Sequence, residues 1–299
     1  MDRSKTLKGY AGLFICAALW GAMFVPLDLA IEELGEYRSM AIRAAAAALF
    51  FFFLFIFNKN RNNWFQKNHI VSGMLGGLLF TAEMLFLILA LGVGDVARVG
   101  LLITTTAIMI PFIDGIIYKR WPGNIFFVPA IGIFLGYAIK SNFELQEIIT
   151  LSESDGYVLV SAFFFASHIA FLGNLPSTLN LRIFNGWQML FHALFSILLF
   201  WAVPLENFAI PQTLLPYFYA FISGFIGMSL LLWLQAICQQ FVTPTGAAVI
   251  LITDGLFAAL AGYIFLGIML NDYEFVGYGI VFCSALLATV LDVRRQKQT

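Results

Sequence analysis

The chain has 299 residues, of which 61% are hydrophobic and only 11% are charged. Because a soluble domain carries about a quarter charged residues, this composition excludes a soluble globular protein. The net charge of −1 offers no basic face, so we expect no nucleic-acid partner. The cysteines, Cys16, Cys238 and Cys283, lie in apolar segments without a Cys-x-x-Cys pair. That pattern favours free thiols over a disulfide or a metal site, and we expect no cofactor.

Hydropathy and turn signals divide the chain into ten apolar segments that can cross a bilayer as helices. They are residues 9–29, 38–57, 69–91, 95–118, 124–140, 156–174, 182–203, 214–238, 242–267 and 273–292. Several connections are short, which requires antiparallel neighbouring helices. The sequence therefore predicts an all-α integral membrane protein with ten transmembrane helices.

The connections differ in charge from one side of the predicted membrane to the other. If there are ten spans, most of the sixteen Lys and Arg residues fall on the side that carries both termini, and the opposite side is rich in Asp and Glu. The positive-inside rule then predicts cytoplasmic termini. We expect a multi-pass protein, in contact with membrane lipid, in the cytoplasmic (inner) membrane of a bacterium.

The two halves of the chain resemble each other. Residues 95–106 are similar to residues 244–255, at an offset of 149 residues. Residues 1–147 and 148–299 are therefore predicted to be two five-helix repeats of one membrane domain. Since five is odd, the second repeat must be inverted in the membrane, which is typical of secondary transporters with a site near the midplane.

Several motifs resemble those of one known family. They are Leu-Trp-Gly-Ala-Met-Phe at 19–24, Ala-Ile-Arg-Ala-Ala at 41–45, Val-Thr-Pro at 242–244 and Gly-Tyr-Gly at 277–279. In order and spacing the chain resembles EamA-type members of the drug/metabolite transporter superfamily. The resemblance implies a 5+5 inverted repeat, a central cavity lined mainly by spans 1, 3, 4, 6, 8 and 9, and transport of amino acids, nucleobases or other small metabolites.

Two acidic residues, Glu83 and Asp254, lie near the middle of predicted spans. An acid at the centre of a membrane helix costs about 2.5–3.5 kcal/mol on insertion scales, so each needs a partner or a wet cavity. One interpretation is that they bind a substrate ammonium group or carry a proton, which would couple transport to a proton or another ion. The other is a structural bond to a neighbouring helix.

Other polar and aromatic residues complete the candidate site. Further candidates for substrate binding are Trp20, Phe24, Thr105, His168, Trp233 and Tyr263, and Arg98 is a candidate for the outer mouth. Each aromatic residue has the alternative of packing or lipid contact, and Arg98 that of an ion pair with Asp95. Arg43 and His192 are expected to be structural, through snorkelling or bonds between helices.

These features favour a secondary transporter that moves a small polar or zwitterionic metabolite, such as an amino acid, by alternating access. We expect a monomer or a weak dimer. The alternative is an integral membrane enzyme that acts on lipid or peptide. It is disfavoured because the acids are scattered over different helices and no His-Glu-x-x-His, Gly-x-Ser-x-Gly or Walker motif is present.

Overall fold

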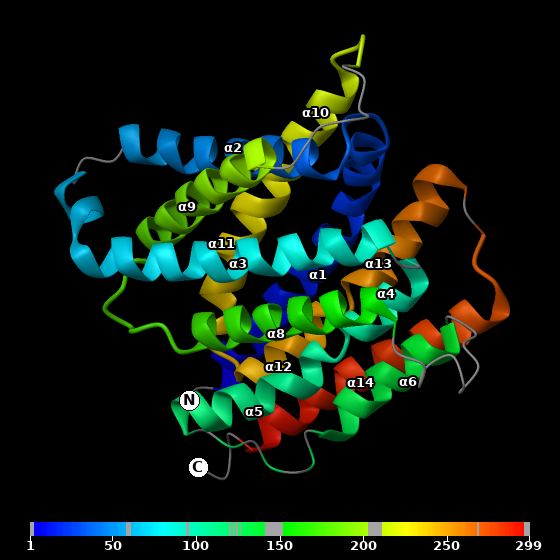
Figure 1. Cartoon of the computed structure of the whole chain (residues 1–299). Helices are drawn as coiled ribbons and strands as arrows, with labels where there is room; N and C mark the ends of the chain where they lie inside the picture. Colours follow the sequence, from blue (N-terminus) through cyan, green and yellow to red (C-terminus); the bar gives the residue numbers. More distant parts are fainter. Residues whose placement is uncertain are drawn as a thin grey trace.

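In the computed structural model, every regular element of the described residues is a helix (Figure 1). It describes residues 3–57, 61–93, 96–119, 121, 123, 125, 127–140, 152–202, 211–267 and 269–295. Within these residues, nine helices are long and apolar enough to cross a membrane, and Phe127–Lys140 is a shorter apolar helix. Together they account for the ten predicted spans, and the all-α membrane fold is confirmed.

The first five spans and the connections between them contain seven helices. These are α1 (Arg3–Leu34), α2 (Glu36–Ile56), the short η1 (Arg61–Phe65), α3 (Lys67–Val93), α4 (Val96–Ile103), α5 (Thr106–Tyr118) and α6 (Phe127–Lys140). The predicted bounds of the first span were too narrow, because the helix continues into the polar residues at both ends. Gly35, at φ 73°, separates α1 from α2, a conformation that favours glycine.

The last five spans contain more interruptions. Their helices are α8 (Glu153–Gly173), α9 (Leu181–Ala202), α10 (Leu215–Ile222), η3 (Ser223–Met228), α11 (Ser229–Gln239), α12 (Pro244–Leu251), α13 (Asp254–Ala261), η4 (Gly262–Leu266) and α14 (Asp272–Arg295). The segments η3 and η4 are π-helical. Such bulges are common at functional positions within membrane and soluble helices.

The fourth and ninth spans were each predicted as one helix, and each consists of two. The helix is broken halfway, between α4 and α5 in the fourth span and between α12 and α13 in the ninth. At the breaks, the hydroxyl groups of Thr104 and Thr253 donate hydrogen bonds of 2.6 Å to the carbonyl oxygens of Leu101 and Ile250. Threonine side chains that bond the local backbone compete with the helical pattern. Thr104 and Thr253 are 149 residues apart in the sequence, and so are Leu101 and Ile250. The breaks are therefore at equivalent positions in the two repeats.

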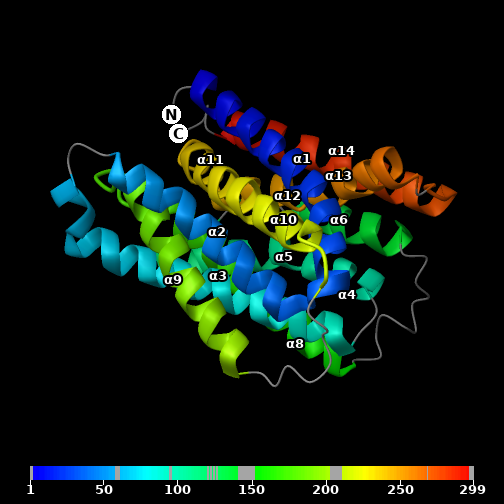
Figure 2. The same ribbon diagram turned by 90° about the horizontal axis from the view of Figure 1, so that it is seen from above.

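The two halves of the chain pack against each other along most of their length. The most extensive packing joins α3 to α8 and α9, α6 to α14, α2 to α9, and α1 to α11 and α13. In each of these pairs one helix comes from each half. Both chain ends lie together at one end of the bundle in two perpendicular views, as an even number of spans requires (Figures 1 and 2).

Candidate functional site

Asp254 is the first residue of α13, directly after the break in the ninth span. Its Oδ1 atom accepts a hydrogen bond of 2.7 Å from the backbone amide of Gly255. The residue lies deep in the bundle, yet part of its surface remains accessible. The break therefore places this carboxyl group at the first turn of a helix, halfway along the ninth span.

Glu83 lies on α3 and is almost completely buried, with 4% of its surface exposed. Its backbone oxygen accepts a 2.9 Å bond from the hydroxyl of Ser161 on α8. Its carboxyl atom Oε2 has no hydrogen-bond partner in the described part of the chain. The carboxyl groups of Glu83 and Asp254 lie within electrostatic range of each other. Two acids from opposite repeats are thus within reach of each other's charge.

Tyr137 of α6, which the sequence did not single out, supports the break beside Asp254. Its hydroxyl donates a 3.1 Å hydrogen bond to the carbonyl oxygen of Ile252, a group that a continuous helix would have satisfied. The hydroxyl lies where a Cβ atom on Gly255 would be. Tyr137 and its neighbour Tyr278, whose ring centroids are 6.2 Å apart, both interact electrostatically with Asp254.

We expect Gly255→Ala and Tyr137→Phe to affect stability in a non-additive way. The alanine methyl group collides with the tyrosine hydroxyl, and such overpacking costs about 1–3 kcal/mol. Tyr137→Phe removes one hydrogen bond, which contributes about 1 kcal/mol. Because phenylalanine has no hydroxyl, the double variant should lose less than the sum of the two single losses. Melting temperatures of the four detergent-purified proteins test this, and simple additivity would contradict it.

The four aromatic candidates separate into two pairs. Trp20 donates a 2.8 Å hydrogen bond from Nε1 to the carbonyl oxygen of Gly227. Trp20 and Trp233 both pack against a central apolar cluster. Phe24 and Tyr263, in contrast, are 46% and 48% exposed. Only the two tryptophans are therefore placed in the interior beside other candidate residues.

The central apolar cluster is formed by residues of four helices and the π-helical segment η3. Its buried members are Ala47, Phe51, Phe80, Met189, Met228 and Leu232. It adjoins Glu83, which follows Phe80 by three residues on α3. A Cβ atom on Gly21 of α1 would collide with the backbone oxygen of Asp254, so α1 packs closely against the start of α13.

The remaining predicted residues have different surroundings. The hydroxyl of Thr105 donates to the carbonyl oxygen of Leu102 at 2.7 Å, so its proton is used within the break of the fourth span. His168 is buried on α8, with Nε2 3.4 Å from the side-chain oxygen of Gln188. Arg98 lies within α4, but its side chain is outside the described residues.

Two residues that the sequence analysis treated as structural lie inside the bundle with unsatisfied polar atoms. They are Arg43 on α2 and His192 on α9, whose side chains interact electrostatically. Arg43 Nε and His192 Nε2 are buried and have no hydrogen-bond partner among the described residues. The signal was present in the sequence, since an arginine within an apolar span is rare and commonly functional.

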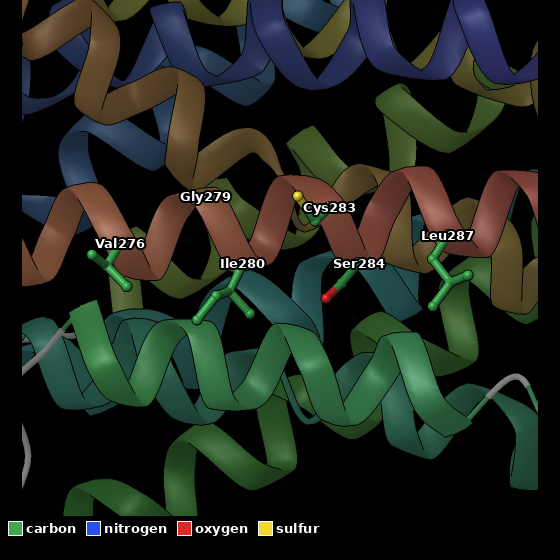
Figure 3. Close-up of a pocket in the computed structure, with 6 residues that line it drawn as sticks. All are labelled: Val276, Gly279, Ile280, Cys283, Ser284 and Leu287. Carbon is green, nitrogen blue, oxygen red and sulfur yellow. The ribbon is translucent and has the colours of Figure 1, made fainter.

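A groove along α14 contains no acidic, arginine or tryptophan side chain in its lining (Figure 3). It has a volume of about 350 Å³ and is lined by Val276, Gly279, Ile280, Cys283, Ser284 and Leu287 of α14. The side chains of Val276, Ile280, Ser284 and Leu287 point toward α6. None of the candidate substrate-binding residues is in its lining. Nor do the described residues contain a group of three His, Cys, Asp or Glu side chains that could hold a metal ion.

Comparison with known proteins agrees with this architecture. The model of the EamA-like transporter family matches residues 7–141 and, a second time, residues 154–290. An uncharacterised transporter of Archaeoglobus fulgidus is 24% identical over 289 residues, covering 96% of this chain and 87% of the relative. A crystal structure of another protein aligns with a TM-score of 0.74 and 13% identity, over 98% of this chain and 99% of that one. The structural likeness shows the fold alone.

Proposed function

The chain belongs to the EamA-like transporter family, and from this premise we propose that it moves a small zwitterionic metabolite of amino-acid size across the membrane. The observation that carries the proposal is the buried carboxyl group of Glu83, whose Oε2 has no partner in the described residues, within electrostatic range of Asp254 from the other repeat. A buried carboxyl oxygen without a partner is costly, and a substrate ammonium group supplies both the missing donor and the compensating charge. The apolar cluster next to Glu83 would contact a nonpolar substrate side chain.

The arrangement of the repeats supports alternating access as the transport mechanism. Both acids sit where helices of the two halves pack together, and the fourth and ninth spans are broken at equivalent positions. Rocking of one repeat against the other would open this region to each side in turn, as in other transporters built from inverted repeats. Exchange of the bound ammonium group for a proton at the same carboxyl groups would couple transport to the proton gradient.

We also propose that both termini face the cytoplasm. The support is the concentration of Lys and Arg on the connections that share the termini's side, together with the position of both termini at one end of the bundle (Figure 2). A protease added to sealed, right-side-out vesicles should then leave tags at both termini intact. Cleavage of the tags in such vesicles would show that the termini face the outside of the cell.

The proposed substrate class is tested with the purified protein and a panel of amino acids, nucleobases, sugars and organic acids. A ligand that binds only the folded state raises its stability by about 2.7 kcal/mol at a concentration of 100 Kd. We expect zwitterionic amino acids to raise the melting temperature and to be taken up by proteoliposomes, with an internal pH-sensitive dye reporting proton exchange. Stabilisation by sugars or organic acids alone would overturn the proposal.

A further inference from the structure

Arg43 is a cation in the interior of the bundle. It lies on α2, seven residues after the first residue of the helix. The side chain is deep within the molecule and yet partly accessible, while its Nε atom is fully buried without a hydrogen-bond partner in the described residues. The guanidinium group therefore has donor capacity left unused within the described residues.

The backbone around Arg43 is held closely. A Cβ atom on Gly224 of η3 would collide with the carbonyl oxygen of Arg43, so glycine allows α2 and the π-helical segment to approach at this point. One turn further along α2, the backbone of Ala47 accepts a 3.3 Å bond from Ser229. These contacts fix the position from which the long arginine side chain extends, which reduces the entropy lost when it binds a ligand.

His192 lies within electrostatic range of Arg43 and has one ring nitrogen without a partner in the described residues. The hydroxyl of Thr81 lies 2.7 Å from the carbonyl oxygen of Gly77 and 2.8 Å from His192 Nδ1. Nε2 is buried without a partner in the described part of the chain. The contact at Nδ1 holds the ring in place, so that Nε2 is the nitrogen left over for interactions in the interior.

Arg43 and Glu83 adjoin the same central apolar cluster from different helices. Arg43 precedes the cluster residue Ala47 by one helical turn on α2, and Glu83 follows the cluster residue Phe80 by three residues on α3. The ring of Phe80 also contacts that of His192, with centroids 4.8 Å apart. A cation and a carboxyl group, Arg43 and Glu83, thus adjoin one apolar region from different helices, which matches a ligand with an anionic group, a cationic group and a nonpolar side chain.

We propose that Arg43 binds the carboxylate of the substrate, with His192 as a positioning residue, so that the transporter selects molecules that carry a carboxylate beside their ammonium group. This inference rests on the proposed function, because the acids must hold the ammonium group. The planar guanidinium fork pairs with a carboxylate through two parallel hydrogen bonds. An amine without the carboxylate would leave the arginine unpaired and should bind more weakly.

The test compares a mixture of the twenty standard amino acids with a matched mixture of their decarboxylated amines. Both are titrated against the wild-type protein and against Arg43→Gln, Arg43→Lys, His192→Phe and, as a control, Arg182→Gln in the first turn of α9. Thermal stabilisation and competition in proteoliposome uptake are the two readouts. Basal melting temperature and size-exclusion profile identify any variant that does not fold, and Arg43→Lys, which keeps the charge, carries the test if Arg43→Gln is such a variant.

We expect the wild-type protein to prefer amino acids over amines by tenfold or more. Arg43→Gln and Arg43→Lys should lose most of this preference by weakening amino-acid binding while amine binding stays the same, and His192→Phe should reduce it partly. Arg182→Gln should behave as wild type. Equal wild-type response to both mixtures, or an unchanged preference in the Arg43 variants, overturns the role of Arg43 but leaves the proposed function standing. No response to either mixture overturns the proposed function itself.

Discussion

Asp254→Asn and Glu83→Gln should each abolish saturable transport while leaving the protein folded. A hydrogen bond to a charged group contributes about 1.5–3 kcal/mol, so the loss of either carboxylate should weaken substrate binding roughly 10- to 150-fold by the same principle. The amide side chains keep the size and polarity of the acids. The basal melting temperature should stay the same or rise, since a charge buried in the membrane interior is itself destabilising. Uptake into proteoliposomes and substrate-induced stabilisation measure the two effects separately.

The controls use exposed acids of the same types. Asp28→Asn on α1 and Glu33→Gln near its end make the same chemical changes where the side chains are exposed, and they should transport at the wild-type rate. The double variant of Glu83 and Asp254 should be no worse than either single variant, because residues that bind one group as a unit are strongly non-additive. Independent, multiplicative losses would mean that the acids serve separate purposes.

The fold was largely predictable because membrane insertion imposes simple constraints on the sequence. Each span must be apolar and helical, since unsatisfied backbone groups are costly in lipid, and charges must gather in the connections. The ten spans followed from these rules. The breaks in the fourth and ninth spans did not, because a hydropathy average over a whole span does not register the side-chain bonds of Thr104 and Thr253 on which the breaks depend.

The candidate site was predictable only in part. Glu83 and Asp254 stood out because an acid in an apolar segment is rare. Arg43 and His192 were assigned to structure, because hydropathy cannot show whether a polar side chain finds its partner within the protein. Tyr137 was missed because its role depends on the approach of α6 to the broken helix beside Gly255, a contact between residues far apart in sequence.

The repeats share a scaffold but differ in their chemistry. At the offset of 149 residues, Thr104 corresponds to Thr253 and makes the same hydrogen bond of 2.6 Å to the carbonyl three residues earlier. The next position is Thr105 in one repeat and Asp254 in the other. The symmetric positions thus build the helix breaks, and the asymmetric positions place charge at only one of them. This division suits an asymmetric substrate bound between two similar halves.

Helices α6 and α14, one from each half of the chain, pack closely against each other. A Cβ atom on Gly277 would collide with the carbonyl oxygen of Gly136 and lie 2.6 Å from the backbone nitrogen of Lys140, and one on Gly136 would lie 2.7 Å from the carbonyl oxygen of Gly277. Small residues that let backbones approach are the main source of helix association in membranes. Gly132 and Gly136, one helical turn apart on α6, both face α14.

Gly277→Ala should therefore destabilise the protein strongly, while Gly279→Ala, two residues away on the same helix, should not. A methyl group at position 277 meets backbone atoms that cannot rotate away, so α6 and α14 must separate, at a cost of about 1–3 kcal/mol or more. At position 279 a methyl group has no neighbour within 4 Å among the described residues, and alanine favours the helix by about 1 kcal/mol. Thermal unfolding of both variants in the same detergent measures the difference. Equal melting temperatures would mean that the two helices do not depend on this glycine contact for their association.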